Sequence, residues 1–258
     1  MPASDPAANP VQYDDPLQQL CETGQQKLIA TDYLGAETIL MQAEAMASER
    51  DDLATLGRLY YPLQEARRQR RQVCGEGVVR LDLWANGPDD AIDPLHVLSH
   101  HPHGQLLVAG WASIEPALQV RQAAAEKELF VETYLAAIYP VSETDRVVAV
   151  VPSADVALPP ADAAASGVDQ LQRKLPPHSV VLATSDVPRG TRAGSAETFG
   201  YTMNLWESLA APFLATAKAT TDPRRRIAAY RQVIDIDYAC EKAHQWLAET
   251  ALSLARGD

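Results

Sequence analysis

The spacing of apolar and polar positions divides the chain into two helical ends and a strand-rich centre. Near both ends, around residues 17 to 73 and 205 to 255, apolar residues recur every three or four positions, which is the spacing of an amphipathic helix. In the centre, short runs rich in Val and Leu alternate with stretches of helical spacing. The pattern therefore predicts an α/β segment set between two helical segments.

Four central runs have the length and the β-branched content of strands. They are 78–84, 105–109, 146–151 and 179–183. Helices are predicted between these runs, from about Ile114 to Tyr139 and around Val168 to Leu175. Continuous Val and Leu runs separated by helices are typical of a parallel sheet covered on both faces. We therefore predict an α/β fold with a small parallel sheet of about four strands and covering helices.

The same patterns place the boundaries of the parts. The first ten residues are rich in Pro, Ala and Asp, which predicts a disordered tail over residues 1–16. An N-terminal helical hairpin plus a further helix follows over 17–76, then the α/β domain over 77–200, and finally a C-terminal helical segment over 201–258.

Large and small residues alternate in the N-terminal hairpin as they do when two antiparallel helices pack closely. Leu20 holds a large position, Gly24 a small one, and the second helix continues with Ala36, Leu40 and Ala43. This order resembles the 34-residue tetratricopeptide repeat. The positions that depart from the repeat are Thr23, Lys27 and Ser48, where Leu, Tyr and Pro are expected.

The C-terminal segment resembles the same repeat, with Ala210 and Leu214 in a first helix and Tyr230 in a second, although Arg226 stands where a small residue is expected. The resemblance implies tetratricopeptide-like hairpins that bind a protein or peptide on a concave surface. A stable array usually needs about three repeats, which neither end supplies alone. The two ends therefore either pack together or pack separately on the sheet.

The charge balance excludes some partners. The chain has 22 basic and 34 acidic residues, a net charge of −12, which disfavours nucleic acids and anionic membrane surfaces. It also has no apolar run of membrane-spanning length and no basic start of a secretory signal, so we expect a cytoplasmic protein. One basic cluster, Arg67 to Arg71, precedes Gly75 and Gly77, and we expect it to offset the dipole at a helix end.

The carboxyl edge of the predicted sheet is where ligands of open α/β sheets bind. Our candidate ligand-binding residues lie after the predicted strands or in the loop 188–198: Gly110, Trp111, Ser113, Ser153, Asp186, Arg189 and Arg192. The turn at Gly110 enters a helix whose first amide groups suit an anion, and the two arginines with Asp186 suit a phosphate or carboxylate ligand if that loop closes. The alternative is that Ser113 is an ordinary N-cap and the loop a solvated linker.

The remaining candidates for chemistry are weaker. Four histidines cluster in one short segment, and His100, His101 and His103 are candidate metal ligands, although Pro102 and Gly104 favour a plain surface loop there. No nucleophile motif is present, and no cofactor is expected. Our main hypothesis is a non-catalytic protein-interaction or assembly module of unknown partner and oligomeric state. The alternative is an enzyme or a small-anion-binding domain that uses the carboxyl edge of the sheet.

Overall fold

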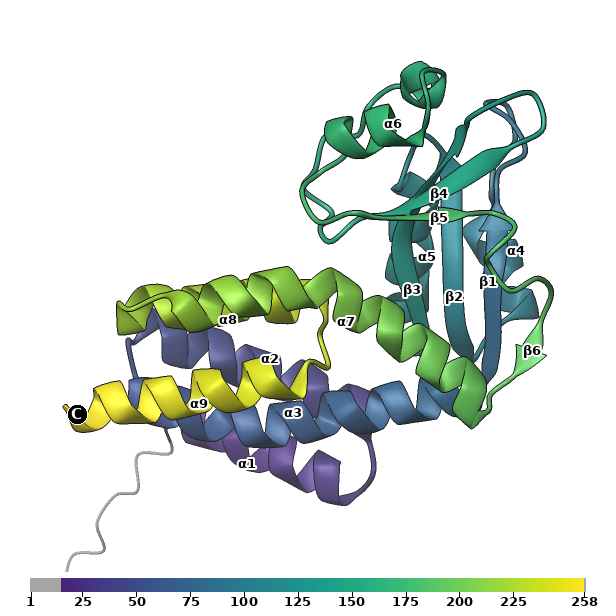
Figure 1. Ribbon diagram of the computed structural model, residues 1–258. Coiled ribbons are helices and arrows are strands. Elements are labelled where there is room, and N and C mark those ends of the chain that lie inside the picture. Colours follow the sequence, from purple (N-terminus) through teal and green to yellow (C-terminus); the bar gives the residue numbers. More distant parts are fainter. Residues whose placement is uncertain (1–14, 258) are drawn as a thin grey trace, which may run out of the picture.

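The computed structural model describes residues 15–257, which form an α/β protein. Six long helices lie together as one helical body, and a sheet with its short helices stands beside them (Figure 1). The predicted tail over 1–16 lies outside the described residues except for Asp15 and Pro16, which cap and begin the first helix.

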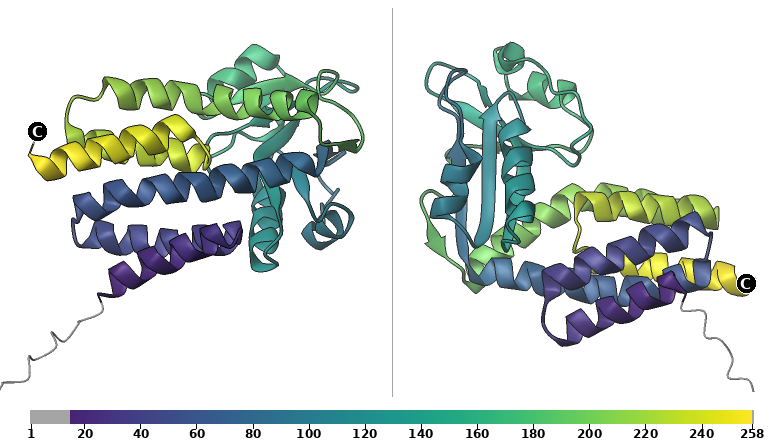
Figure 2. Two further views of the ribbon diagram at one scale, coloured as in Figure 1. Left: turned by 90° about the horizontal axis from the view of Figure 1, so that it is seen from below. Right: turned by 180° about the vertical axis from the view of Figure 1, so that it is seen from behind.

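The helical body combines both ends of the chain. Its helices are α1 (Pro16–Ile29), α2 (Tyr33–Glu49), α3 (Leu53–Glu76), α7 (Ala196–Ala219), α8 (Pro223–Ile236) and α9 (Glu241–Arg256). Several begin at an aspartate whose carboxylate accepts a first-turn amide N–H, as Asp32 does for α2 and Asp222 for α8. In Figures 1 and 2, α9 lies along α3 and α8 lies along α9. The two ends therefore pack together, and the sheet segment is an insertion between α3 and α7.

Two glycines permit the close approach of these helices. A Cβ atom on Gly57 of α3 would lie 2.6 Å from Leu252 Cγ and 3.0 Å from the carbonyl oxygen of Ala248, both on α9. A Cβ atom on Gly24 of α1 would lie 2.6 Å from Leu40 Cγ on α2. Gly24 thus occupies a close-packing position, as the sequence pattern predicted.

The described residues form one mixed sheet of six strands in the order β5-β4-β3-β2-β1-β6. The strands are β1 (Val78–Trp84), β2 (Gly104–Trp111), β3 (Val131–Pro140), β4 (Arg146–Val150), β5 (Val180–Ala183) and β6 (Arg192–Ala193). Strands β1, β2 and β3 are parallel, whereas β4, β5 and β6 pair antiparallel to their neighbours. The predicted four-stranded parallel sheet was therefore wrong in strand number and in the direction of β4, which runs opposite to β1, β2 and β5.

The error has a physical source in one segment. The predicted helix from Ile114 to Tyr139 is two elements, α5 (Glu115–Glu126) and then strand β3. Every residue of β3 except its last is buried, so its apolar run is nearly continuous and has no strand-like alternation. Such a run cannot be told from a buried helix by periodicity alone. Because β3 was missed, β4 was taken for a parallel strand, although it forms a hairpin with β3.

The two faces of the sheet pack against different helices. Residues such as Leu106, Val108 and Tyr139 face a core shared with α4 (Pro94–His100), α5 and α6 (Val168–Lys174). A short 3₁₀ helix (Ala161–Ala164) adds to this core. The opposite face, including Leu107 and Tyr134, shares a core with the helical body. This second face brings the sheet to the C-terminal half of α3 and the N-terminal half of α7 (Figure 1).

Candidate binding groove

The carboxyl edge of the parallel strands gathers most of the predicted ligand-binding residues. Gly110 and Trp111 end β2, and Ser113 follows in the turn, where its Oγ accepts the amide N–H of Glu115 at 3.2 Å. The structure places the N-cap of α5 at Ile114 rather than at Ser113. Asp186 follows β5, whose last residue pairs with Val147 at this same edge.

Two other predicted residues lie away from that edge. Ser153 follows β4, which runs antiparallel to β3 and ends opposite Ala136, in the middle of β3. Arg192 belongs to β6 and pairs with Val79 at the amino end of β1, whereas Arg189 lies over the ring of Trp84 at the carboxyl end. The structure therefore does not bring Arg189 and Arg192 together.

At the carboxyl edge, two guanidinium groups lie over tryptophan rings. The Arg189 carbon Cζ is 4.5 Å from the centre of the Trp84 ring, and that of Arg146 is 5.6 Å from the Trp111 ring. Arg146 also donates a hydrogen bond to the carbonyl oxygen of Asn86 at 2.8 Å, which ties β4 to the loop after β1. The sequence analysis placed Arg146 and Trp84 in predicted strands but did not single them out as candidate ligand-binding residues.

The histidine segment begins in helix α4, which has Asp93 as its N-cap and ends at His100. Residues 101–103 form the short loop that was expected before β2. The rings of His96 and His100 lie 4.3 Å apart, while His103 bonds the Val73 carbonyl oxygen. In residues 15–257, no group of three or more His, Cys, Asp or Glu side chains is arranged to hold a metal ion.

A groove of about 990 Å³ opens elsewhere, between α3, α7 and the start of α9. One wall is a stripe of apolar residues along α7, formed by Phe199, Met203, Ala211 and Leu214, which are partly or fully exposed. The buried side chains of Arg71 and Asp237 lie at its base. Among the lining residues, charged side chains occupy the rim on all three helices.

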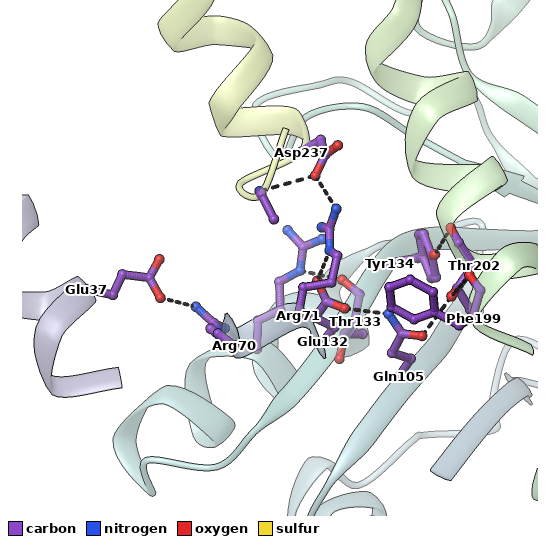
Figure 3. A network of polar contacts seen from close by, with 12 residues as sticks. Glu37, Arg70, Arg71, Gln105, Glu132, Thr133, Tyr134, Phe199, Thr202 and Asp237 are labelled. Carbon is purple, nitrogen blue, oxygen red and sulfur yellow. Dashed lines mark hydrogen bonds and ion pairs between the residues drawn. The ribbon is translucent and has the colours of Figure 1, made fainter. Parts of the chain in front are cut away.

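The base of the groove is part of a buried ion-pair network, shown in Figure 3. Arg71 on α3 donates to Glu132 of β3 through Nε (2.9 Å) and to Asp237, in the turn before α9, through Nη1 (2.6 Å). Its carbon Cζ lies 5.0 Å from the centre of the Trp206 ring and 4.8 Å from that of the Tyr238 ring. One arginine thus joins α3, the sheet, α7 and the turn before α9.

The network continues across the sheet to α7. Glu132 accepts a hydrogen bond from Gln105 Nε2 at 2.6 Å, and Gln105 Oε1 accepts one from the Thr202 hydroxyl at 2.7 Å. The Tyr134 hydroxyl donates to the carbonyl oxygen of Thr202 at 2.7 Å, and its ring stacks on Trp206 with centres 4.3 Å apart. The sheet is therefore fixed to α7 by this aromatic contact and by the polar contacts that Figure 3 shows.

A second buried cluster joins α2, α3 and α9. Glu37 accepts hydrogen bonds from Arg67 Nε at 2.9 Å and from Arg70 Nη1 at 2.8 Å. Arg67 Nη1 lies 3.3 Å from Nε2 of the buried His244, whose Nδ1 is 2.9 Å from the Cys240 carbonyl oxygen. Because an arginine only donates, Nε2 of His244 must accept, and Nδ1 carries the proton.

These contacts shift the acid–base behaviour of the buried groups. Burial disfavours the charged form of Arg71, but the carboxylates of Glu132 and Asp237 outweigh it and hold the pKa of Arg71 well above its usual value. Burial raises the pKa of Asp237, against the effect of Arg71. Burial and the charge of Arg67 lower the pKa of His244 to about 3, so it is neutral at physiological pH.

The sequence analysis missed this network because it treated Arg67 to Arg71 as charges at a helix end. Helix α3 continues to Glu76 and has no basic residue in its last turn. Arg67, Arg70 and Arg71 instead point inward and pair with acids that are 30 or more positions away. The available signal was the spacing of 67, 70, 71 and Cys74, which places the three arginines on one helix face with a buried cysteine.

The sequence matches no protein-family model, and no curated protein or solved structure shows significant similarity to it. Within the described residues, no helix is long and apolar enough to span a bilayer.

The pKa of His244 predicts a pH dependence of stability. Its folded value of about 3 lies below the ordinary value of 6.5, so below about pH 6.5 the unfolded chain binds a proton that the folded protein does not. Stability is therefore expected to fall as the pH falls from about 6.5 toward about 3. In urea titrations over this range, the variant His244→Gln, which keeps an acceptor for Arg67, is expected to show a shallower decline. If the free energy of unfolding fell equally steeply with pH in both proteins, the lowered pKa of His244 would not be the cause.

Proposed function

We propose that this protein binds a segment of a partner protein in the groove between α3, α7 and α9. The observation that carries the proposal is the groove itself. Its volume is about 990 Å³. This is at the upper end of the range for small-molecule and cofactor pockets, which is roughly 300 to 1,000 Å³. Its apolar wall is exposed, and buried ion pairs hold its base in place. Because the base is already ordered, binding costs less conformational entropy, as in a preformed site.

We also infer that the helices of the two ends pack in a tetratricopeptide-like manner. What supports it is the close packing at Gly24 and the side-by-side placement of helices from both ends. Where the sheet is inserted, the end of α3 meets the segment before α7, because the Gly194 amide N–H donates to the Gly77 carbonyl oxygen at 2.7 Å. The groove opens between these two helices and the start of α9. The scaffold then presents a helical surface to the partner, as helical repeats do.

Covalent catalysis has less support than binding at this site. Cys240 lines the groove as the N-cap of α9, where a thiol would be favoured as a nucleophile if its pKa were low. Burial instead raises the pKa of Cys240 to about 11. The thiol is therefore protonated at neutral pH, which favours a role in binding or packing.

The carboxyl edge of the sheet remains a second candidate site, for small anions. The favouring observation is that Arg146 and Arg189 lie over tryptophan rings and, among the described residues, form no ion pair with a carboxylate. Thermal unfolding with added phosphate, sugar phosphates or nucleotides tests it, since a ligand that binds the folded state must raise stability. No rise with any of them would count against this second site.

Blocking the groove is expected to abolish partner binding without unfolding the protein. Ala211 is exposed and lines the groove, so Ala211→Trp fills it from the α7 wall. Ala215 is also exposed on α7 but does not line the groove, which makes Ala215→Trp the matched control. In pull-downs from the native cell, proteins captured by the natural chain should be lost with Ala211→Trp and kept with Ala215→Trp. Capture that survives both changes would rule out the groove as the binding site.

A further inference from the structure

We propose that the occupant of the groove is an amphipathic helix of a partner protein, with an apolar face and basic flanks. This inference rests on the proposed function, because it names the chemistry of the segment that the groove binds. Two observations carry it: the spacing of the apolar residues on α7 and the charges on the rim.

The apolar wall has the length and regularity of a helix-binding surface. Phe199, Met203, Ala211 and Leu214 are separated by four, eight and three positions, so they fall on one face of α7. This face also carries Glu207, which stands between Met203 and Ala211. At 1.5 Å per residue, the stripe from Phe199 to Leu214 is about 22 Å long. A peptide helix of similar length can lay its own apolar stripe against it, which is the helix-in-groove mode of recognition.

The rim of the groove carries negative charge, which favours a peptide with basic flanks. Exposed carboxylates stand on each of the three helices around the groove: Glu76 on α3, Glu207 on α7 and Glu241 on α9. Within residues 15–257 none of these three forms an ion pair. Lys242, also on the rim, opposes them with a single positive charge. The unpaired charges of the rim therefore sum to about −2, which favours a basic partner.

The base of the groove does not reverse this preference. Arg71 is the buried cation there, and it is shared by Glu132 and Asp237, so the three together carry one negative charge if both acids are ionised. Arg68, at the rim, is paired with Glu65 at 2.8 Å. An acidic ligand would thus meet cations that already have carboxylate partners.

The charges also argue against two other occupants. A second copy of this chain carries the same net charge of −12, so its surface is repelled by the acidic rim. The chain's own first 14 residues contain Asp5 and Asp14 and no Lys or Arg, so they lack the basic flank that the rim favours. A basic segment from a different protein is the occupant that fits both the wall and the rim.

The test uses three fluorescently labelled peptides of about 16 residues, the length that spans the stripe. The first has Leu and Ala at helical spacing with Lys flanks, the second has the same apolar face with Glu flanks, and the third has the composition of the first with its periodicity scrambled. Binding to the full chain is measured by fluorescence anisotropy at low and physiological salt. We expect the first peptide to bind most tightly and to weaken as salt rises.

Charge variants separate the groove from the general acidity of the surface. The triple variant Glu76→Gln, Glu207→Gln, Glu241→Gln is expected to weaken binding of the first peptide about tenfold. The control changes three exposed carboxylates that lie outside the groove, Glu22→Gln, Glu126→Gln and Glu143→Gln, and should leave binding nearly unchanged. Equal weakening by both triples, or equal binding of the scrambled or Glu-flanked peptide, would overturn the proposal.

Ala211→Trp separates two claims: that peptides bind in the groove, and that the groove prefers basic segments. If it abolishes binding of the Glu-flanked peptide as well, and that peptide binds as tightly as the first, the groove is a binding site but its preference for basic segments is refuted. If binding of no peptide responds to Ala211→Trp, the inference fails together with the proposed use of the groove.

Discussion

Replacing Arg71 by Met is expected to lower the free energy of unfolding by about 3–5 kcal/mol. Met fills much of the volume of Arg71 but leaves Glu132 and Asp237 buried without their cation. The loss should be smaller at acidic pH, since burial raises the pKa of Asp237 and, without the guanidinium that opposes this effect, its carboxyl group can become neutral. Urea titrations at two pH values measure both effects.

The matched control is Arg68→Met, three positions earlier on the same helix. Arg68 pairs with Glu65, and both side chains are about two-fifths exposed, so this change should cost less than about 1 kcal/mol. If Arg71→Met cost no more than Arg68→Met, the ion pairs at the base of the groove would not be what joins α3 to the sheet.

Replacing Trp206 by Ala is also expected to cost about 3–5 kcal/mol. Trp206 is 3% exposed, stacks on Tyr134 of the sheet and lies beneath the guanidinium of Arg71. Its loss removes an aromatic contact between α7 and β3 and leaves a cavity in the core that the sheet shares with the helical body. Chemical denaturation followed by circular dichroism measures the cost.

Trp206→Phe serves as the control for this prediction. Trp206 Nε1 has no hydrogen-bond partner in the described structure, so Phe removes part of the ring without breaking a hydrogen bond. We expect Phe to recover more than half of the stability lost in the Ala variant, because it can still stack on Tyr134. A Phe variant as unstable as the Ala variant would show that stacking is not the main contribution.

The sequence predicted the elements of this fold well where local patterns were clear. Strand β1 was predicted with its observed bounds, Val78–Trp84, and α6 within a residue of its observed bounds, because alternation or helical spacing is visible in each. Strand β3 was missed because burial on both faces removes the alternation that marks a strand. Missing this strand also made the predicted direction of β4 wrong, because β4 forms a hairpin with β3.

Local sequence patterns could not predict the groove, for a different reason. Its walls come from α3, α7 and α9, so the residues of α3 lie more than 100 positions from those of the other two helices. Their proximity depends on the packing of the two chain ends, which the sequence left open as one of two arrangements. The Arg67–Arg71 cluster was visible in the sequence, but its carboxylate partners, such as Glu132 and Asp237, become identifiable only when the fold is known.

Hydrogen exchange with and without the Lys-flanked amphipathic peptide tests the binding of a partner helix in the groove most directly. We expect slower exchange of amides along the groove, in residues 199–214 of α7, at the start of α9 and in the last turns of α3, with little change elsewhere. Protection confined to the carboxyl edge of the sheet, around Trp84 and Gly110 to Ser113, would contradict it. So would peptide binding that leaves exchange in α7 unchanged.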